Sequence, residues 1–281
     1  MTGLRLLVLD AYAPEGREAL RGAGGTEAGR LYERMLRHLA PDAKVEVAYP
    51  ADPQPDLPSG IALTEYDGIA WTGSSLTIHH HHDPRVRRQL EFAREAYTAG
   101  VPSFGSCWAA QVAVVAAGGR CAPSPKGREF GVSRGIRLSE QGRSHPLFAG
   151  KPPVFDAFTS HADEVVELGR GRLLASNDWS RVQAVTVAEG PGRFWALQYH
   201  PEYDLHEVAS LCRLRADELV AQGSFRDRAA ANAWAEDLEL LQRDPTREDV
   251  IQNLHLSPEL LDEELRTLEV RNWLATLRHG V

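Results

Sequence analysis

The chain has 281 residues, 43% of them hydrophobic, which is enough to bury one sizeable core with or without an extension. Its formal net charge of −8 excludes a general basic attraction to nucleic acid or anionic lipid, so neither is an expected partner. The apolar run from Leu6 to Leu9 is too short for a signal-peptide core or a membrane span, and no other segment reaches the required length. A cytoplasmic location without membrane contact is therefore expected.

The first half of the chain alternates strands with helices. An apolar strand is predicted over 4–9, and the Gly-rich segment 21–30, which has no nucleotide-binding glycine pattern, is interpreted as a flexible turn. The elements that follow are a helix over 31–39, strands over 44–49 and 66–72, a helix over 84–99, a strand over 101–104 and a helix over 108–117. This alternation predicts an α/β fold with a largely parallel sheet.

The second half has a different pattern. Strands are predicted over 131–138, 154–158, 182–188 and 193–199 without long helices between them, which indicates a partly antiparallel region. From about Leu205 the chain is rich in Leu, Ala, Glu and Arg, with apolar residues at helical spacing. We therefore predict one domain over 1–204 and a helical C-terminal extension over 205–281, whose role the sequence leaves open.

Three cysteines are present, and their odd number and wide spacing argue against a disulfide framework or a cysteine-rich zinc site. No motif surrounds Cys121 or Cys212, which are interpreted as core residues. Cys107, in contrast, follows the strand-and-glycine segment VPSFGS and precedes a helix. A side chain on such a tight turn projects from the sheet, and a helix N-terminus favours a thiolate. A plain buried cysteine is the alternative interpretation of this segment alone.

A histidine and a carboxylate stand together far downstream, in FWALQYHPEY. The apolar strand ends at His200, and Pro201 favours an extended backbone there. Residues two apart in an extended segment face the same way, so Glu202 can orient the His200 ring while the other ring nitrogen faces a nucleophile. A surface turn is the alternative, and it is the joint occurrence with the cysteine motif that favours catalysis.

The two motifs together resemble the class I (triad) glutamine amidotransferase family, most closely its stand-alone GMP synthase-like members. The family's elbow G-x-C-x-G-x-Q corresponds to Gly105-Ser-Cys107-Trp-Ala109-Ala-Gln111, and its Q-[FY]-H-P-E segment corresponds to residues 198–202 without a departure. SHADEV, residues 160–165, is similar to the family's S-H-x-D-x-V segment. The resemblance covers roughly 4–203 and implies a flavodoxin-like fold.

The resemblance also implies a mechanism and a set of site residues. Cys107 would attack the glutamine side-chain amide, helped by His200 and Glu202, and release ammonia from a γ-glutamyl thioester without a metal or other cofactor. The remaining implied roles are an oxyanion hole from the backbone of Gly73 and Trp108, and a substrate pocket lined by Gln111, Ser160 and His161.

One position departs from the family pattern, since Ala109 replaces the second glycine of the elbow. If this position needs a positive φ, alanine would cost roughly 1–2 kcal/mol. If it needs only a small side chain, alanine is nearly neutral and favours the helix, which is the interpretation that a position inside the first helical turn supports.

Three functions remain open at this point. The first is a glutaminase that supplies ammonia to a separate synthetase, since the chain has neither a P-loop nor a pyrophosphatase loop of its own. The second is a stand-alone hydrolase of γ-glutamyl or other amides, and the third is a non-catalytic regulatory or binding protein.

Two further features stay undecided. His79 to His82 form either a solvated loop or a metal site, and Glu129 either positions substrate or makes a structural ion pair.

Overall fold

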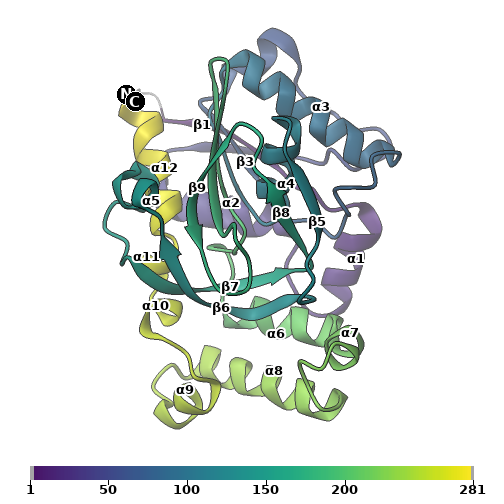
Figure 1. Ribbon diagram of the computed structural model, residues 1–281, viewed down its shortest axis with the longest axis vertical. Coiled ribbons are helices and arrows are strands. Elements are labelled where there is room, and N and C mark those ends of the chain that lie inside the picture. Colours follow the sequence, from purple (N-terminus) through teal and green to yellow (C-terminus); the bar gives the residue numbers. More distant parts are fainter. Residues whose placement is uncertain (1–2, 280–281) are drawn as a thin grey trace.

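A nine-stranded mixed sheet forms the centre of the computed structural model, which describes residues 3–279 (Figure 1). Half of the sheet is parallel, in the order β2-β1-β3-β4-β11. Its strands are β1 (Arg5–Leu9), β2 (Lys44–Ala48), β3 (Gly68–Trp71), β4 (Ser103–Ser106) and β11 (Gly192–Leu197). The parallel strands predicted from the first half of the sequence are thereby confirmed.

The other half of the sheet is antiparallel and continues from β11 in the order β10-β9-β6-β7. These strands are β10 (Ala184–Glu189), β9 (Gly171–Ser176), β6 (Glu129–Leu138) and β7 (Val154–His161). A separate antiparallel pair is formed by β5 (Arg120–Pro123) and β8 (Asp163–Glu167). The predicted change to a partly antiparallel second half is confirmed, although β5, β8 and β9 were not predicted.

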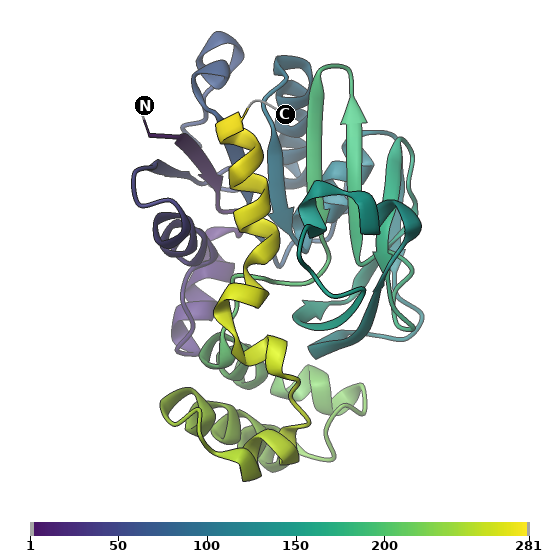
Figure 2. The ribbon, with the colours of Figure 1, turned by 90° about the vertical axis from the view of Figure 1, so that its left-hand side faces the viewer.

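Helices cover both faces of the parallel half. One apolar cluster joins Leu6 and Val8 to α2 (Ala28–Leu39) and α12 (Leu268–His279), and Figure 2 shows α12 lying along the sheet. A second cluster, on the opposite face, joins Leu7 and Leu9 to residues of α3 and α4. These helices are α3 (Pro84–Ala99) and α4 (Trp108–Ala116). The result is a three-layer α/β/α arrangement, in agreement with the predicted fold class.

The helix predicted over 84–99 has these bounds in α3, because both ends carry strong signals. Asp83 caps the start by accepting a hydrogen bond from the Arg85 N–H, and Gly100 ends the helix with a φ of 73°.

The prediction of one turn over 21–30 was wrong in extent. Helix α1 (Pro14–Gly22) enters this segment and α2 begins at Ala28, and α1 escaped prediction because its PEGREALRG sequence is mainly polar and contains two glycines.

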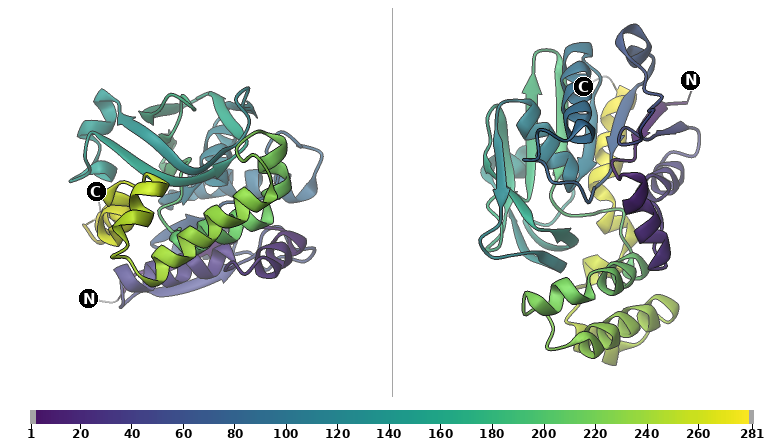
Figure 3. Two further views of the ribbon diagram at one scale, coloured as in Figure 1. Left: turned by 90° about the horizontal axis from the view of Figure 1, so that it is seen from below. Right: turned by 90° about the vertical axis from the view of Figure 1, so that its right-hand side faces the viewer.

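Helices fill the C-terminal segment, and Figure 3 shows most of them gathered at one end of the molecule. They are α6 (Leu205–Leu214), α7 (Ala216–Ala221), α8 (Arg228–Arg243), α9 (Glu248–Leu254), α10 (Pro258–Leu261), α11 (Glu263–Arg266) and α12. Helices α6 to α10 share an apolar cluster that includes Tyr12 and Phe158. None of the helices in residues 3–279 is long and apolar enough to cross a membrane. The division into two domains stays a prediction.

The last helix is attached to the core by a buried charged pair. The Lys151 ammonium lies 3.0 Å from the Glu269 carboxylate, and the two side chains are 3% and 0% exposed. The Tyr199 hydroxyl donates a second hydrogen bond to Glu269 at 2.6 Å. On the same helix, Trp273 stacks on Phe104 of β4 with a centroid distance of 5.5 Å. Helix α12 therefore contacts β4 and the segment that follows β11.

We predict that Glu269→Gln destabilises the fold strongly, because it leaves the Lys151 ammonium buried without a counter-charge. The expected loss is about 3–5 kcal/mol in the free energy of unfolding, measured by urea denaturation. The control is Glu91→Gln, which breaks an exposed pair with Arg87 and should cost less than about 1 kcal/mol. Equal losses in the two variants would contradict the prediction.

Candidate active site

Cys107 occupies a strained turn between β4 and α4. Its backbone has a φ of 54° and a ψ of −99°, a conformation that non-glycine residues rarely adopt. The turn is held because the Cys107 N–H donates to the Leu197 carbonyl at 2.7 Å and the Cys107 carbonyl accepts from the Ala110 N–H at 3.0 Å. The side chain is thereby fixed at the carboxyl edge of the parallel strands, where sites of α/β sheets usually form.

Small residues make this turn possible. A Cβ on Gly105 would lie 2.3 Å from the Trp71 carbonyl oxygen and 2.5 Å from the Ala109 Cβ, so any side chain there would collide. Among the non-glycine residues in the described part of the chain, only Cys107 and His255 have a positive φ. Ala109 is therefore an ordinary residue of the first turn of α4, and the strain lies at the cysteine instead.

His200 and Glu202 follow β11 and form a buried pair next to Cys107. The His200 Nδ1 lies 2.7 Å from the Glu202 Oε1, and both side chains are at most 2% exposed. A Cβ on Gly73 would lie 3.0 Å from the His200 Cε1 and 3.6 Å from the Cys107 Cβ. Gly73 thus contacts the imidazole and the cysteine together, and the three segments that carry them meet at one point.

The charge of Glu202 decides the protonation of His200. Burial alone would lower the pKa of His200, but the Glu202 carboxylate and hydrogen bonds to Cys107 and Glu202 raise it to about 9. The imidazole is therefore protonated at neutral pH. Apart from Cys107, its buried Nε2 has no hydrogen-bond partner within the described residues, which leaves this nitrogen available to a reacting group.

Three further side chains hold the pair in place. The Ser106 hydroxyl donates to the Glu202 Oε1 at 2.8 Å, and the Tyr32 hydroxyl donates to the Ser106 Oγ at 2.7 Å. The Tyr203 ring stacks on the His200 ring with a centroid distance of 3.9 Å and an interplanar angle of 5°. Sequence reasoning missed these supports. Ser106 and Tyr203 stand next to Cys107 and Glu202 in the two motifs, whereas Tyr32 reaches the site from α2 and had no local signal.

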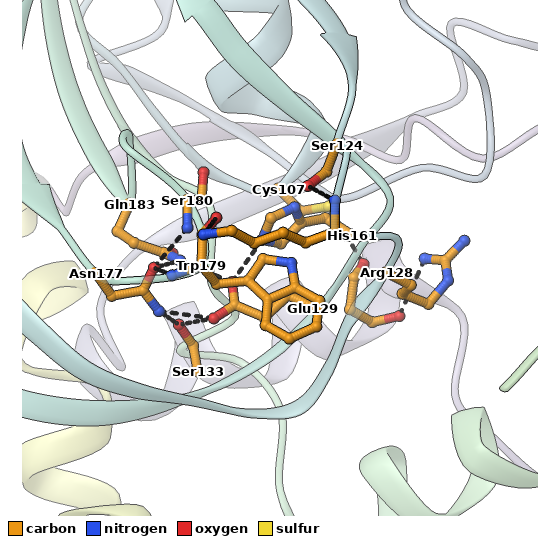
Figure 4. A network of polar contacts seen from close by, with 12 residues as sticks. Cys107, Ser124, Arg128, Glu129, Ser133, His161, Asn177, Trp179, Ser180 and Gln183 are labelled. Carbon is orange, nitrogen blue, oxygen red and sulfur yellow. Dashed lines mark hydrogen bonds and ion pairs between the residues drawn. The ribbon is translucent and has the colours of Figure 1, made fainter. Parts of the chain in front are cut away.

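A second polar network lies beside the cysteine, and Figure 4 shows its members. The Cys107 Sγ donates to the Ser160 carbonyl at 3.7 Å, and the neighbouring His161 places its Nε2 2.8 Å from the Glu129 Oε2. Asn177, Ser133 and Gln183 also donate to Glu129.

The Glu129 carboxylate is charged in this network. Burial opposes its charge, but the hydrogen bond and charge of His161, followed by the amides, hold the pKa of Glu129 below its usual value. The geometry supports the ion-pair interpretation of Glu129.

The structure places the other predicted site residues as follows. Trp108 begins α4, so its backbone N–H has no helical acceptor, while its indole donates to Gln89 at 2.7 Å. Gln111 is buried one helical turn beyond Cys107. Ser160 reaches the cysteine through its carbonyl, and the His161 ring points into the Glu129 network instead.

The remaining cysteines and histidines have other environments. Burial raises the pKa of Cys121 and of Cys212 to about 12, which makes them unreactive core thiols. His79 lies 3.8 Å from the Asp163 carboxylate, so its loop contacts the segment that follows His161. Across residues 3–279, no group of three or more His, Cys, Asp or Glu side chains is arranged to hold a metal ion.

Comparison with known proteins identifies the family. Residues 30–212 match the family model described as glutamine amidotransferase class-I. A γ-glutamyl-L-1-hydroxyisopropylamide hydrolase from a Pseudomonas species is 32% identical over 98% of this chain and 93% of its own length. A glutamine-hydrolysing GMP synthase from Clostridium novyi is 28% identical, but over 48% of this chain and only 24% of its own length.

A solved structure shows the same fold. The glutamine amidotransferase from Thermotoga maritima superposes with a TM-score of 0.67 at 16% identity, over 99% of both chains. The family match and the full-length relative go further than the fold, since together they cover the cysteine turn and the segment that carries His200. The chain belongs to the class I glutamine amidotransferase family and is an amidohydrolase of that type.

Proposed function

We propose that this chain is a stand-alone hydrolase of γ-glutamyl amides that uses Cys107 as its nucleophile. The observation that carries the proposal is the strained Cys107 beside a His200–Glu202 pair that is already formed in a single chain. The substrate class is supported by the hydrolase relative, whose match spans nearly all of both chains. That match extends through the C-terminal helices, which lie mostly outside the family model at 30–212.

The geometry supports a two-step reaction. The Cys107 thiol gives its proton to His200, the resulting thiolate adds to the amide carbonyl, and the backbone N–H groups of Gly73 and Trp108 hold the oxyanion. His200 gives its proton to the leaving amine, so the C–N bond breaks and a γ-glutamyl thioester remains. His200, now neutral, takes a proton from water as the water oxygen attacks the thioester, and the C–S bond breaks to release glutamate and the Cys107 thiolate beside the protonated His200. The balance is amide plus water to glutamate plus amine.

The partners of Glu202 have a defined task in this scheme. The Glu202 carboxylate lies 2.7 Å from the His200 Nδ1. It keeps the imidazole ring in one orientation and stabilises the imidazolium. The hydrogen bond from Ser106 fixes the carboxylate, and Tyr32 fixes the serine. The ring of Tyr203 covers one face of the imidazole and restricts its rotation.

Glutamine is the second candidate substrate, with ammonia passed to a separate synthetase. The observation in its favour is the similarity to glutamine-hydrolysing GMP synthases, although that match covers about half of this chain. Glutamine is itself the simplest γ-glutamyl amide, so the two candidates share the acyl group and differ in the amine. The third interpretation, a non-catalytic binding protein, is disfavoured by the assembled site.

Glutamine and γ-glutamyl isopropylamide distinguish the candidates when glutamate release is measured for each. We expect faster hydrolysis of the alkylamide, and a loss of at least about a thousandfold in Cys107→Ala, because the nucleophile is absent. Cys121→Ala is the matched control and should retain activity, since that thiol lies in the core. Turnover of glutamine alone would favour the glutaminase, and full activity in Cys107→Ala would reject both.

The protonation of His200 gives a second prediction. His200 should keep its proton until the pH approaches about 9 and lose it as the pH rises further. In Glu202→Gln the burial remains without the charge, so the pKa should fall below the ordinary value of 6.5. Histidine resonances followed by NMR across this pH range measure both midpoints. Glu167→Gln, at an exposed position, is the control, and an unchanged His200 midpoint in Glu202→Gln would contradict the prediction.

A further inference from the structure

A group of three charged side chains, one of which is connected to Cys107 through Ser160, has no role in the chemistry described above. The Arg128 Nε lies 2.8 Å from the Glu218 Oε1, and the Arg215 Nη1 lies 3.3 Å from the Glu218 Oε2. Arg128 comes from the loop before β6, whereas Arg215 and Glu218 come from the start of α7. Two guanidinium groups therefore share one carboxylate, which leaves one positive charge uncompensated within the group.

The group is connected to the nucleophile through Ser160. The Arg128 Nη1 donates to the Ser160 Oγ at 3.4 Å, and the carbonyl of the same serine accepts from the Cys107 Sγ at 3.7 Å. One residue thus separates the guanidinium from the reacting sulfur. Figure 4 shows Arg128 beside the network that contains Cys107 and His161.

Arg215 acts electrostatically on two tyrosines near Cys107. Burial raises the pKa of Tyr203, the ring stacked on His200, and among nearby charges the Arg215 guanidinium opposes this rise. Burial raises the pKa of Tyr12 to about 12, while Arg215 and Arg128 oppose it and Cys107 adds to it. Arg215 and Cys107 therefore act on both buried hydroxyls, and Arg128 acts on that of Tyr12.

The group also contains a donor whose hydrogen bond is not made within the described residues. The Arg215 Nε is buried and has no hydrogen-bond partner among the described residues, although a buried donor of this kind normally has one. The Arg128 and Arg215 side chains are only 11% and 18% exposed, whereas Glu218 is 36% exposed. Helix α7 is fixed in this position because Gln222, at its end, accepts from the Arg128 backbone N–H at 3.0 Å.

We infer that Arg128, Arg215 and Glu218 form the subsite that binds the α-amino-acid head of a γ-glutamyl substrate. The two guanidinium groups bind the α-carboxylate and Glu218 binds the α-ammonium group. Charge and geometry fit this head, because a guanidinium binds a carboxylate through paired hydrogen bonds and a carboxylate accepts from an ammonium group. The inference rests on the proposed function, since it assigns the acyl side of the same site.

The length of the substrate agrees with this placement. Three carbon–carbon bonds separate the reacting carbonyl carbon from the α-carbon, which is about the 3.8 Å between consecutive Cα atoms. The Cys107 sulfur contacts the carbonyl of Ser160 and the Arg128 guanidinium contacts the hydroxyl of the same residue. The γ-glutamyl group is placed along this one-residue spacing. The subsite also gives α7 a function, because this helix supplies Glu218 and Arg215 directly precedes it.

Truncated substrates test each contact separately. The parent is γ-glutamyl isopropylamide. 4-Aminobutanoyl isopropylamide lacks the α-carboxylate, and N-isopropylglutaramate lacks the α-ammonium group. In Arg128→Gln and in Arg215→Gln, kcat/KM should fall about tenfold or more for the parent and for N-isopropylglutaramate. It should stay within about twofold for the amide that has no carboxylate to bind.

Glu218→Gln should give the converse pattern. Its kcat/KM should fall about tenfold or more for the parent and for 4-aminobutanoyl isopropylamide, and should be unchanged or higher for N-isopropylglutaramate. A change in folding or in Cys107 reactivity would lower kcat/KM for all three substrates alike. The pattern across substrates therefore separates a loss of binding from a general structural effect.

Two neighbouring residues provide matched controls. Arg213→Gln removes the same charge from the end of α6, where Arg213 pairs with Glu239 at 3.0 Å. Asp217→Asn alters an exposed carboxylate that pairs with Arg228 at 2.7 Å. Both variants should leave all three substrates within about twofold of the wild type, because neither residue belongs to the subsite.

The outcomes separate the subsite from the proposed function. If the wild type hydrolyses the parent and the three variants lose kcat/KM equally on all three substrates, or lose none, the subsite is overturned and the proposed function stands. If the wild type hydrolyses none of the three amides, the proposed function and the subsite are overturned together.

Discussion

The conformation of Cys107 is the constraint on which the site depends. A non-glycine residue with a φ of 54° persists only when its surroundings enforce it. Here the enforcement comes from the Leu197 carbonyl, which accepts from the Cys107 N–H, and from the start of α4. Because Leu197 ends β11, the strand that holds the Cys107 turn also leads into His200. The register between β4 and β11 therefore sets the position of Cys107 relative to the imidazole.

Close approach between these segments requires small residues at two points. Gly105 lies against Trp71 and Ala109, and Gly73 lies against His200 and Cys107, so neither position accommodates a side chain without displacement. The backbone near the sulfur is consequently crowded and rigid, with its N–H groups in fixed directions. Fixed donors are what stabilise a developing oxyanion, because they need no reorganisation during the reaction.

The C-terminal helices are connected to the site by charged and polar contacts. Glu269 of α12 binds Lys151 and Tyr199, the residue before His200, and Glu218 of α7 binds Arg128 beside Ser160. The helical segment thus contacts the residue before His200 at one place and the Arg128 side chain, which contacts Ser160, at another. Its similarity to the full-length hydrolase relative extends over the same region.

Much of this could be predicted from local sequence signals. Helix α3 carried both of its end signals, and Cys107, His200 and Glu202 stood in short motifs at strand ends. The supports of the site could not be predicted in this way. Tyr32, Ser106 and Glu202 meet across 74 and 96 residues of sequence, and the pairing of Arg128 with Glu218 spans 90. Such contacts depend on the register of the sheet and the packing of the helices, which no local pattern encodes.

The most direct test of Cys107 as the nucleophile is to trap the acyl-enzyme. The purified protein is mixed with γ-glutamyl isopropylamide, quenched with acid within a single turnover, digested and examined by mass spectrometry. The expected result is one γ-glutamyl group on the peptide that contains Cys107, formed as the amine is released. Release of the amine in a single turnover with no adduct at any time point, or with the adduct on another residue, would contradict the mechanism.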